Sequence, residues 1–206
     1  MSSQTIKSVS DSQTTILNNI MELCAIQRFD ADITYGNGAF YKNGRVPSPA
    51  WSGDVQPLSA EVHKCSSNAL PFQDATIHSA IFDPPFLTYI KQGRNHSSVM
   101  AKRFGGYWAY SELEEHYSST LSEVGRVMAP KGVLVVKCQD IIHNHKMHPT
   151  HISVVKWAEP WFRLKDLFIL AARHRMPMPV PGRQQHARIY HSYFLVLERA
   201  RGIRQL

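Results

Sequence analysis

The 206-residue sequence has only three cysteines and no long apolar run, and each scarcity excludes a class of protein. Cys24, Cys65 and Cys138 lie far apart and none forms a CxxC pair, which indicates reduced thiols and a cytoplasmic location. No apolar run approaches the roughly 20 residues of a membrane span. The polar N-terminus lacks the apolar core of a signal peptide. We therefore expect neither a disulfide scaffold nor a membrane partner.

Metal-ligand spacing is also missing, although one stretch is rich in histidine. The segment IIHNHKMHPTH contains His143, His145, His148 and His151. These positions form no helical i, i+4 pair with an accompanying carboxylate, and no cysteine is near them. We therefore expect no metal cofactor, with a histidine-bound metal as the minor alternative.

Acidic residues are scarce in the second half of the chain. Residues 1–90 carry 5 Lys or Arg against 8 Asp or Glu, residues 91–206 carry 18 against 8, and the total net charge is +7. This asymmetry is typical of a protein that contacts a polyanion with one side. An ordinary basic surface explains the charge alone equally well.

Segments with helical and strand patterns alternate along the chain, and no linker divides it. We expect one domain over residues 1–206, with residues 1–12 flexible. The alternation predicts an α/β fold with a mostly parallel sheet and helices on both faces. No helix separates the last two strands, which predicts an antiparallel C-terminal β-hairpin at one edge. The expected helices span residues 11–26, 110–128 and 151–162, and the expected strands span residues 28–34, 61–67, 75–83, 132–138, 163–172 and 190–199.

Local signals predict where some of these elements begin and end. Asp11 or Ser12 is the expected cap of the first helix. Ser111 and Glu114 form a capping-box pattern at the start of the second helix, and Pro130 and Gly132 are expected to close it. The glycines and prolines of residues 43–53 predict a loop, and Pro160 is expected to stop the third helix.

Two short motifs lie at predicted strand ends. DITYGNGAF places Gly36 and Gly38 directly after the first strand, where glycine lets a ligand approach the backbone. In FDPPF, two prolines stop the strand just after Asp83 and hold Phe86 nearby. Both ends should lie on one rim of a parallel sheet, where ligands bind. Taken separately, the motifs are also compatible with an ordinary turn and a rigid strand end.

In this order the motifs resemble those of class I S-adenosylmethionine-dependent methyltransferases that methylate exocyclic amines of nucleic-acid bases. That group carries a D/N-P-P-aromatic tetrapeptide after its fourth strand, here residues 83–86. It carries a D-x-T-x-G-x-G-x-F-like segment after its first strand, here residues 32–40. The likeness covers roughly residues 29–199. It implies a Rossmann-like sheet, S-adenosyl-L-methionine as cofactor, and DNA or possibly RNA as partner.

The resemblance also implies roles for individual residues. The Asp83 carboxylate and the Pro84 carbonyl would accept hydrogen bonds from the target amine, and Phe86 would stack on the base. Gln139 and Asp140 would line the target pocket. The implied catalytic residues are Asp83, Pro84, Pro85 and Phe86, and the cofactor-binding residues are Asp32, Thr34, Tyr35, Gly36, Gly38, Phe40, Asp54, Asn68 and Leu70. Two basic loops, residues 91–106 and 172–188, would bind phosphates if they lie on the catalytic rim, and solvated basic loops are the alternative. The expected nucleic-acid-binding residues are Lys91, Arg94, Lys102, Arg103, Arg173, Arg175, Arg183 and Arg188.

The chain departs from the group's pattern in two places. Residues 39–50 show no helix where many relatives have one. Asp54 is the candidate for the acid that binds the ribose hydroxyls, and a plain turn residue is the alternative. We expect adenine N6 of DNA as the target and cytosine N4 second. An RNA base methyltransferase and a catalytically inactive binding subunit are the alternatives, and the choice between monomer and homodimer stays open.

Overall fold

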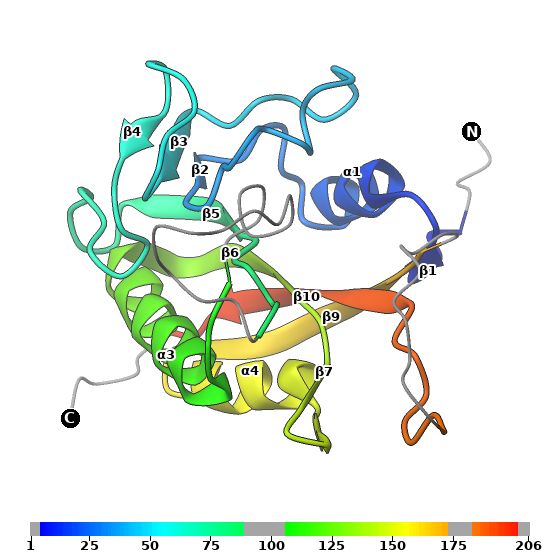
Figure 1. The fold of residues 1–206 in the computed structure, drawn as a ribbon. Coiled ribbons are helices and arrows are strands. Elements are labelled where there is room, and N and C mark those ends of the chain that lie inside the picture. Colours follow the sequence, from blue (N-terminus) through cyan, green and yellow to red (C-terminus); the bar gives the residue numbers. More distant parts are fainter. Residues whose placement is uncertain (1–4, 89–105, 173–182, 202–206) are drawn as a thin grey trace.

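The computed structural model describes residues 5–88, 106–172 and 183–201, which form a large eight-stranded sheet, a two-stranded sheet and three helices (Figure 1). Along the chain the elements are β1 (Val9–Ser10), α1 (Gln13–Leu23), β2 (Ala31–Asp32), β3 (Trp51–Asp54), β4 (His63–Lys64), β5 (Ile77–Phe82), α3 (Tyr110–Val127), β6 (Met128–Cys138), β7 (Ile141–His143), β8 (Lys146–His148), α4 (Thr150–Ala158), β9 (Phe162–Ala171) and β10 (His191–Arg199). The large sheet has the order β1-β9-β10-β6-β5-β2-β3-β4, and β7 pairs with β8.

Strand direction defines the edge of the sheet that carries the site. Every strand of the large sheet runs the same way except β10, which is antiparallel to both β6 and β9. The carboxyl ends of β2, β3, β5 and β6 therefore lie along one edge, which we call the carboxyl rim. Because β10 runs the opposite way, its first residue, His191, also lies at this rim, opposite Ala171 at the end of β9.

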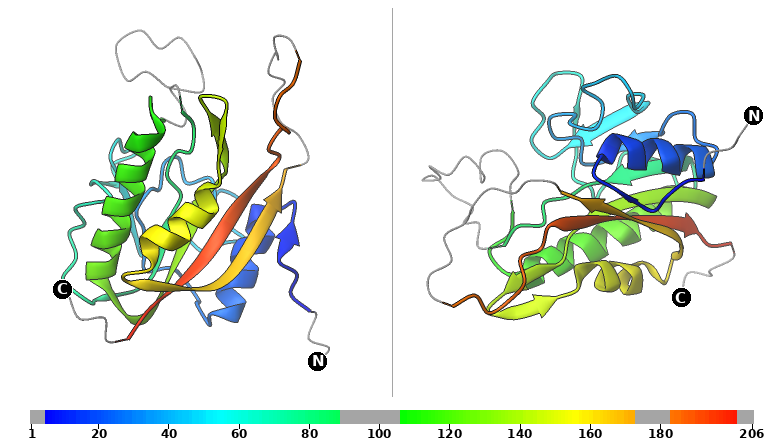
Figure 2. Two further views of the ribbon diagram at one scale, coloured as in Figure 1. Left: turned by 90° about the horizontal axis from the view of Figure 1, so that it is seen from below. Right: turned by 90° about the vertical axis from the view of Figure 1, so that its right-hand side faces the viewer.

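Helices cover both faces of the sheet, as predicted. Figure 2 shows α1 on one face and α3 and α4 on the other. Ile81 and Val135 face the core beneath α1, whereas their neighbours Phe82 and Val136 face the core beneath α3 and α4. This alternation is the two-residue period of strands buried on both faces. None of the helices in the described ranges is long and apolar enough to cross a membrane.

The helix α1 begins after Ser12, one of its two predicted caps. The Ser12 hydroxyl accepts a 3.2 Å hydrogen bond from the backbone N–H of Thr15, so Ser12, not Asp11, is the cap.

The second predicted helix, α3, does not use its predicted cap. Its N-cap is Ala109, and Ser111 lies within the first turn. The predicted capping box is therefore wrong.

Two further boundaries differ from the prediction. β6 begins directly after α3, so Pro130 and Gly132 lie within a strand and do not form a separate helix stop. The pairing of β5 with β6 is irregular here and Lys131 has φ of +68°, which is how a strand accommodates a proline. Residues 51–54 form β3, parallel to β2, although most of them were expected in a loop.

The C-terminal hairpin forms as predicted but does not occupy the outermost position. β9 and β10 pair antiparallel over their length, and β10 lies between β9 and β6. The edge beside β9 is covered by β1, through a parallel pairing of Val9 with Ile169. The placement at the very edge was therefore wrong, because two residues of the N-terminal segment add a strand that no sequence pattern indicated.

Candidate active site

The turn after β2 is built around the buried carboxylate of Asp32. Its Oδ2 accepts a hydrogen bond from the Tyr41 hydroxyl over 2.7 Å, and its Oδ1 accepts one from the Thr34 N–H over 3.1 Å. Asp32 is 1% exposed. Burial raises the pKa of Asp32 to about 7, although both hydrogen bonds act to lower it. The turn therefore contains an acid whose charge changes near neutral pH.

Gly36 and Gly38 give this turn its shape. Their φ angles are +54° and +68°, in the left-handed region that favours glycine. A Cβ on Gly38 would lie 2.8 Å from the hydroxyl oxygen of Tyr35. Tyr35 in turn stacks on Tyr41, with ring centroids 5.4 Å apart. Gly38 therefore leaves room for the Tyr35 ring, which packs on Tyr41 beside Asp32.

Asp54 ends β3, the neighbour of β2, and its carboxylate reaches the glycine turn. Oδ2 accepts a 2.7 Å hydrogen bond from the Gly36 N–H, and Oδ1 accepts a 2.8 Å bond from the Gln56 N–H. The structure thus brings two separately predicted features together. Each carboxylate oxygen has a second lone pair, so Asp54 can hold the turn and still accept a bond from a ligand.

Asp83 follows β5 at the same rim and is tied to the glycine turn through Thr34. The Asp83 N–H donates a 2.7 Å hydrogen bond to the Thr34 hydroxyl oxygen. The Asp83 side chain is 24% exposed, and its Oδ2 lies 3.2 Å from Nζ of Lys137. Burial raises the pKa of Asp83, and the charge of Lys137 opposes that rise. The glycine turn and the tetrapeptide therefore meet at adjacent strand ends.

Lys137 is one of the residues of the site that sequence reasoning missed; Tyr41, the hydrogen-bond partner of Asp32, is another. Lys137 lies on β6, beside β5, with Nζ 5.0 Å from the ring centroid of Phe40 and 5.7 Å from that of Phe194. The signal was a lone cation in the apolar run GVLVVKC, next to a strand that ends in an acid.

Phe40, expected to contact the cofactor, is 5% exposed and packs in the core.

The rest of the tetrapeptide rests on α3. Pro84 is buried, whereas Pro85 and Phe86 are half-buried. The Tyr117 hydroxyl lies 3.5 Å from the Pro85 carbonyl oxygen, at the long limit of a hydrogen bond. The Tyr117 ring also packs edge-on against Phe82, the last residue of β5. The helix thus supports the segment that carries Asp83.

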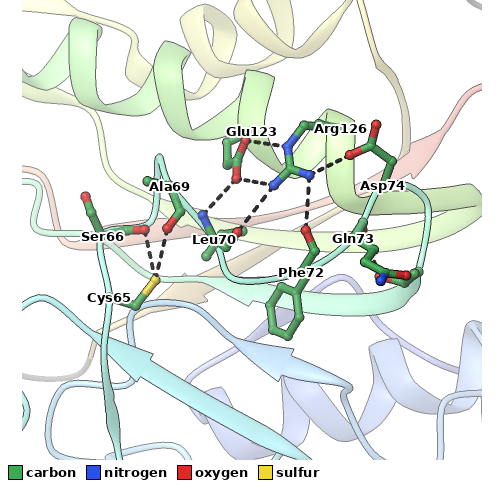
Figure 3. Close-up of polar contacts among 10 residues, drawn as sticks. Cys65, Ser66, Ala69, Leu70, Phe72, Gln73, Asp74, Glu123 and Arg126 are labelled. Atoms are coloured by element: carbon green, nitrogen blue, oxygen red, sulfur yellow. Dashed lines mark hydrogen bonds and ion pairs between the residues drawn. The ribbon is translucent and has the colours of Figure 1, made fainter.

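Arg126 of α3 anchors the loop between β4 and β5 (Figure 3). Its guanidinium donates hydrogen bonds to the carbonyl oxygens of Leu70 and Phe72 over 3.3 and 3.1 Å. It also forms ion pairs of 2.6 Å with Asp74 and Glu123. Glu123 accepts a 2.8 Å bond from the Leu70 N–H. This network fixes the loop that was expected to face the adenine of the cofactor.

The two cofactor candidates in this loop lie in different environments. Leu70 is 6% exposed and belongs to the core beneath α3. Asn68 is exposed, and its side-chain oxygen accepts a 2.7 Å bond from the Ser66 hydroxyl. Ser67 lies 2.8 Å from Nε2 of His116 on α3, whose pKa is lowered by burial. Of the two candidates, only Asn68 presents its side chain to solvent.

A second polar cluster lies where β6, β10 and α4 meet. Oδ1 of Asp140 is 2.7 Å from Nδ1 of His151, and Oδ2 accepts a 3.1 Å bond from the Tyr193 hydroxyl. Tyr193 also lies 2.9 Å from Nε2 of His191, whose carbonyl oxygen accepts a 2.6 Å bond from Gln139. Gln139 and Asp140, expected to line a pocket, are each 4% exposed and connect these elements.

The predicted nucleic-acid contacts lie partly in the segment before β10 and partly outside the described ranges. Arg183 and Arg188 are exposed in the segment before β10. In the described ranges, no group of three His, Cys, Asp or Glu residues could hold a metal. The remaining expected nucleic-acid contacts, Lys91, Arg94, Lys102, Arg103, Arg173 and Arg175, lie outside the described residues.

Solved structures show what this fold is similar to, although no family model and no curated protein matches the sequence. A protein of Sulfolobus solfataricus assigned to the type 11 methyltransferases is 16% identical, with a TM-score of 0.52 over 95% of this chain and 96% of that one. TrmN from Thermus thermophilus is 13% identical, with a TM-score of 0.53 over 92% of this chain and 50% of that one. The chain has a methyltransferase-like fold.

A weaker likeness involves a second protein of Thermus thermophilus, assigned as a DNA modification methylase and solved with S-adenosyl-L-methionine. It is 19% identical, with a TM-score of 0.43 over 66% of this chain and 53% of that one. The chain spans about half the length of the structures of that protein that it matches. This likeness assigns no substrate.

Proposed function

We propose that the protein is an S-adenosyl-L-methionine-dependent methyltransferase that acts on an exocyclic amine of a nucleic-acid base. The observation that carries the proposal is the 2.7 Å hydrogen bond from the Asp83 N–H to Thr34, which places the tetrapeptide against the glycine turn. Ligands of parallel α/β sheets bind at this rim. The methyltransferase-like fold supports the same cofactor.

The cofactor would lie against the glycine turn, and its sulfonium would supply an activated methyl group. Gly36 and Gly38 would let it approach the backbone closely. Asp54 would accept hydrogen bonds from the ribose hydroxyls while still holding Gly36. Asp32, in its charged form beneath the turn, would favour a cationic ligand.

Asp83 would act on the target amine. The lone pair of such an amine is delocalised into the base, so the nitrogen is a poor nucleophile. A carboxylate oxygen that accepts a hydrogen bond from the amine N–H directs the lone pair outward, and the Pro84 carbonyl can accept a second. The prolines fix both acceptors in advance. Phe86, half-buried beside them, would stack on the base.

The proposed substrate is DNA, with adenine N6 first and cytosine N4 second. The supporting observations are the net charge of +7 and the exposed Arg183 and Arg188. The test is incubation of the protein with DNA or with RNA and a cofactor that carries an isotopically labelled methyl group, followed by mass spectrometry of nucleosides. We expect label in N6-methyldeoxyadenosine, and none with Asp83→Ala.

The other outcomes of this experiment assign other functions. Label in N4-methylcytosine changes the target base, and label in ribonucleosides changes the polymer. No label together with a cofactor-induced rise in melting temperature indicates that the substrate is of another kind. No label and no rise in melting temperature contradict the proposed enzyme and favour a binding subunit.

A further inference from the structure

We infer that Lys137 is a positioning residue for Asp83. The ammonium group of Lys137 holds one carboxylate oxygen of Asp83, so that the other oxygen can accept a hydrogen bond from the amine. The inference rests on the proposed function, because it names the residue that prepares Asp83 for its role. Lys137 itself is not expected to touch the substrate.

The contacts of Asp83 are asymmetric. Nζ of Lys137 lies 3.2 Å from Oδ2. Among the residues that the structure describes, no hydrogen-bond donor lies at Oδ1. The backbone N–H of Asp83 is bonded to Thr34, so the main chain that carries the carboxylate is also fixed. One oxygen is therefore held and the other is the candidate acceptor for a substrate N–H.

Lys137 is itself held in place. The pairing of Phe82 with Val136 sets the end of β5 beside β6, so that Lys137 is the next residue along from the pair. The rings of Phe40 and Phe194 lie near its ammonium group, and only 13% of the side chain is exposed. A cation close to aromatic rings is attracted to them, so these rings help to hold the ammonium group beside Asp83.

The charge of Lys137 matters because, within the part of the chain that the structure describes, the other titratable groups near Asp83 do not favour its ionised form. Asp32 from β2 is a second acid, Tyr41 lies beside it, Tyr117 approaches from α3, and Cys138 follows on β6. Burial itself raises the pKa of Asp83. A protonated Asp83 would lose part of its capacity to accept a bond from the amine.

The direction of the pH effect follows from this arrangement. The ionised form of Asp83 is needed, so activity is present above its pKa and is lost as the pH falls through that pKa. Removal of the cation raises the pKa further, and the loss then begins at higher pH. Lys137→Met retains much of the apolar bulk near the two rings without the charge, and Lys137→Arg retains a charge.

The test is the pH dependence of kcat at saturating cofactor and nucleic acid, since kcat reports groups in the bound complex. We expect the acidic limb of Lys137→Met to move to higher pH by about one pH unit. Lys137→Arg should retain the original limb. Lys137→Gln is the second neutral variant if the methionine variant does not fold. A limb that stays in place in a folded neutral variant overturns the inference, as does loss of cofactor affinity as the main effect.

A second measurement separates this inference from the proposed function. The carboxyl carbon of Asp83 is titrated by 13C NMR in the protein without substrate, for the original chain and for both neutral variants. A titration that moves to higher pH in the neutral variants supports the effect of Lys137 on Asp83 even if no nucleic acid is methylated. In that case the proposed function fails alone. An unchanged titration overturns the role of Lys137 even if methylation is observed.

Discussion

The backbone N–H of Gly36 donates a 2.7 Å hydrogen bond to Oδ2 of Asp54, and this bond joins the turn after β2 to the end of β3. The other oxygen of the same carboxylate accepts a bond from the Gln56 N–H. Asp54 therefore shapes the glycine turn whether or not it also contacts a ligand. Its replacement should affect both the turn and the proposed cofactor site.

Asp54→Ala removes an acceptor that two backbone N–H groups use. We expect it to weaken binding of S-adenosyl-L-methionine by at least about tenfold, which is about 1.4 kcal/mol. Asp54→Asn keeps one acceptor oxygen and should give an intermediate loss. Isothermal titration calorimetry measures the cofactor affinity of both variants. Unchanged affinity in the alanine variant would show that Asp54 is a turn residue without a role in binding.

Gly38→Ala tests the close packing of the turn, and Gly44→Ala is its matched control. Both glycines have positive φ, +68° and +67°, so each substitution should cost about 1–2 kcal/mol of stability from backbone strain. Only at Gly38 would the new Cβ also meet Tyr35, because nothing lies within 4 Å at Gly44. Urea denaturation should therefore show a larger loss for Gly38→Ala. Equal losses would contradict the packing argument.

Asp32 should make stability depend on pH. The pKa of Asp32 is about 7 in the folded protein, against an ordinary value of 3.8. The contribution of this group to the free energy of unfolding is therefore full below about pH 4 and is lost as the pH rises to about 7. We expect the free energy of unfolding to fall across this range by up to about 1.4 kcal/mol per pH unit from this group. Denaturation of Asp32→Asn, compared at each pH, should lack this component. Parallel curves would contradict it.

Arg126 should stabilise the fold through its part-buried contacts with two carbonyl oxygens and Glu123 more than through its exposed ion pair with Asp74. Arg126→Met leaves the carbonyl oxygens of Leu70 and Phe72 without this donor, and we expect a loss of about 1–3 kcal/mol in thermal or urea denaturation. Asp74→Ala is the control, since that side chain is 71% exposed, and it should change stability by less than about 0.5 kcal/mol. A larger loss in the control would reverse the ranking.

Much of the fold could be predicted from the sequence because two signals are strong. The helix has a clear apolar period, and the central strand is a continuous apolar run that is buried on both faces of the sheet. The run GVLVVKC and the helix that precedes it were identified for this reason. The short strands β1 and β3 were not, since their two and four residues carry no detectable period and lie in a polar N-terminal segment and in a stretch rich in glycine and proline. Ser111 was an unused cap because α3 begins before it, with Ala109 as the N-cap.

The candidate site could be predicted only where residues at strand ends carry a motif. Asp32, Gly36 and Asp83 were found because parallel strands bring their carboxyl ends to one rim. Lys137 and Tyr41 were missed because their roles depend on lateral neighbours. No spacing along the chain encodes which side chain lies beside another across a sheet.

The most direct test of the proposed role of Asp83 is single-turnover transfer of a labelled methyl group from cofactor-loaded protein to nucleic acid. The measurement compares the original chain with Asp83→Ala at equal cofactor occupancy. We expect transfer to fall by about a hundredfold or more in the variant, with cofactor affinity nearly unchanged. Undiminished transfer, or a variant that no longer binds the cofactor, would contradict the assignment of Asp83 to the target amine.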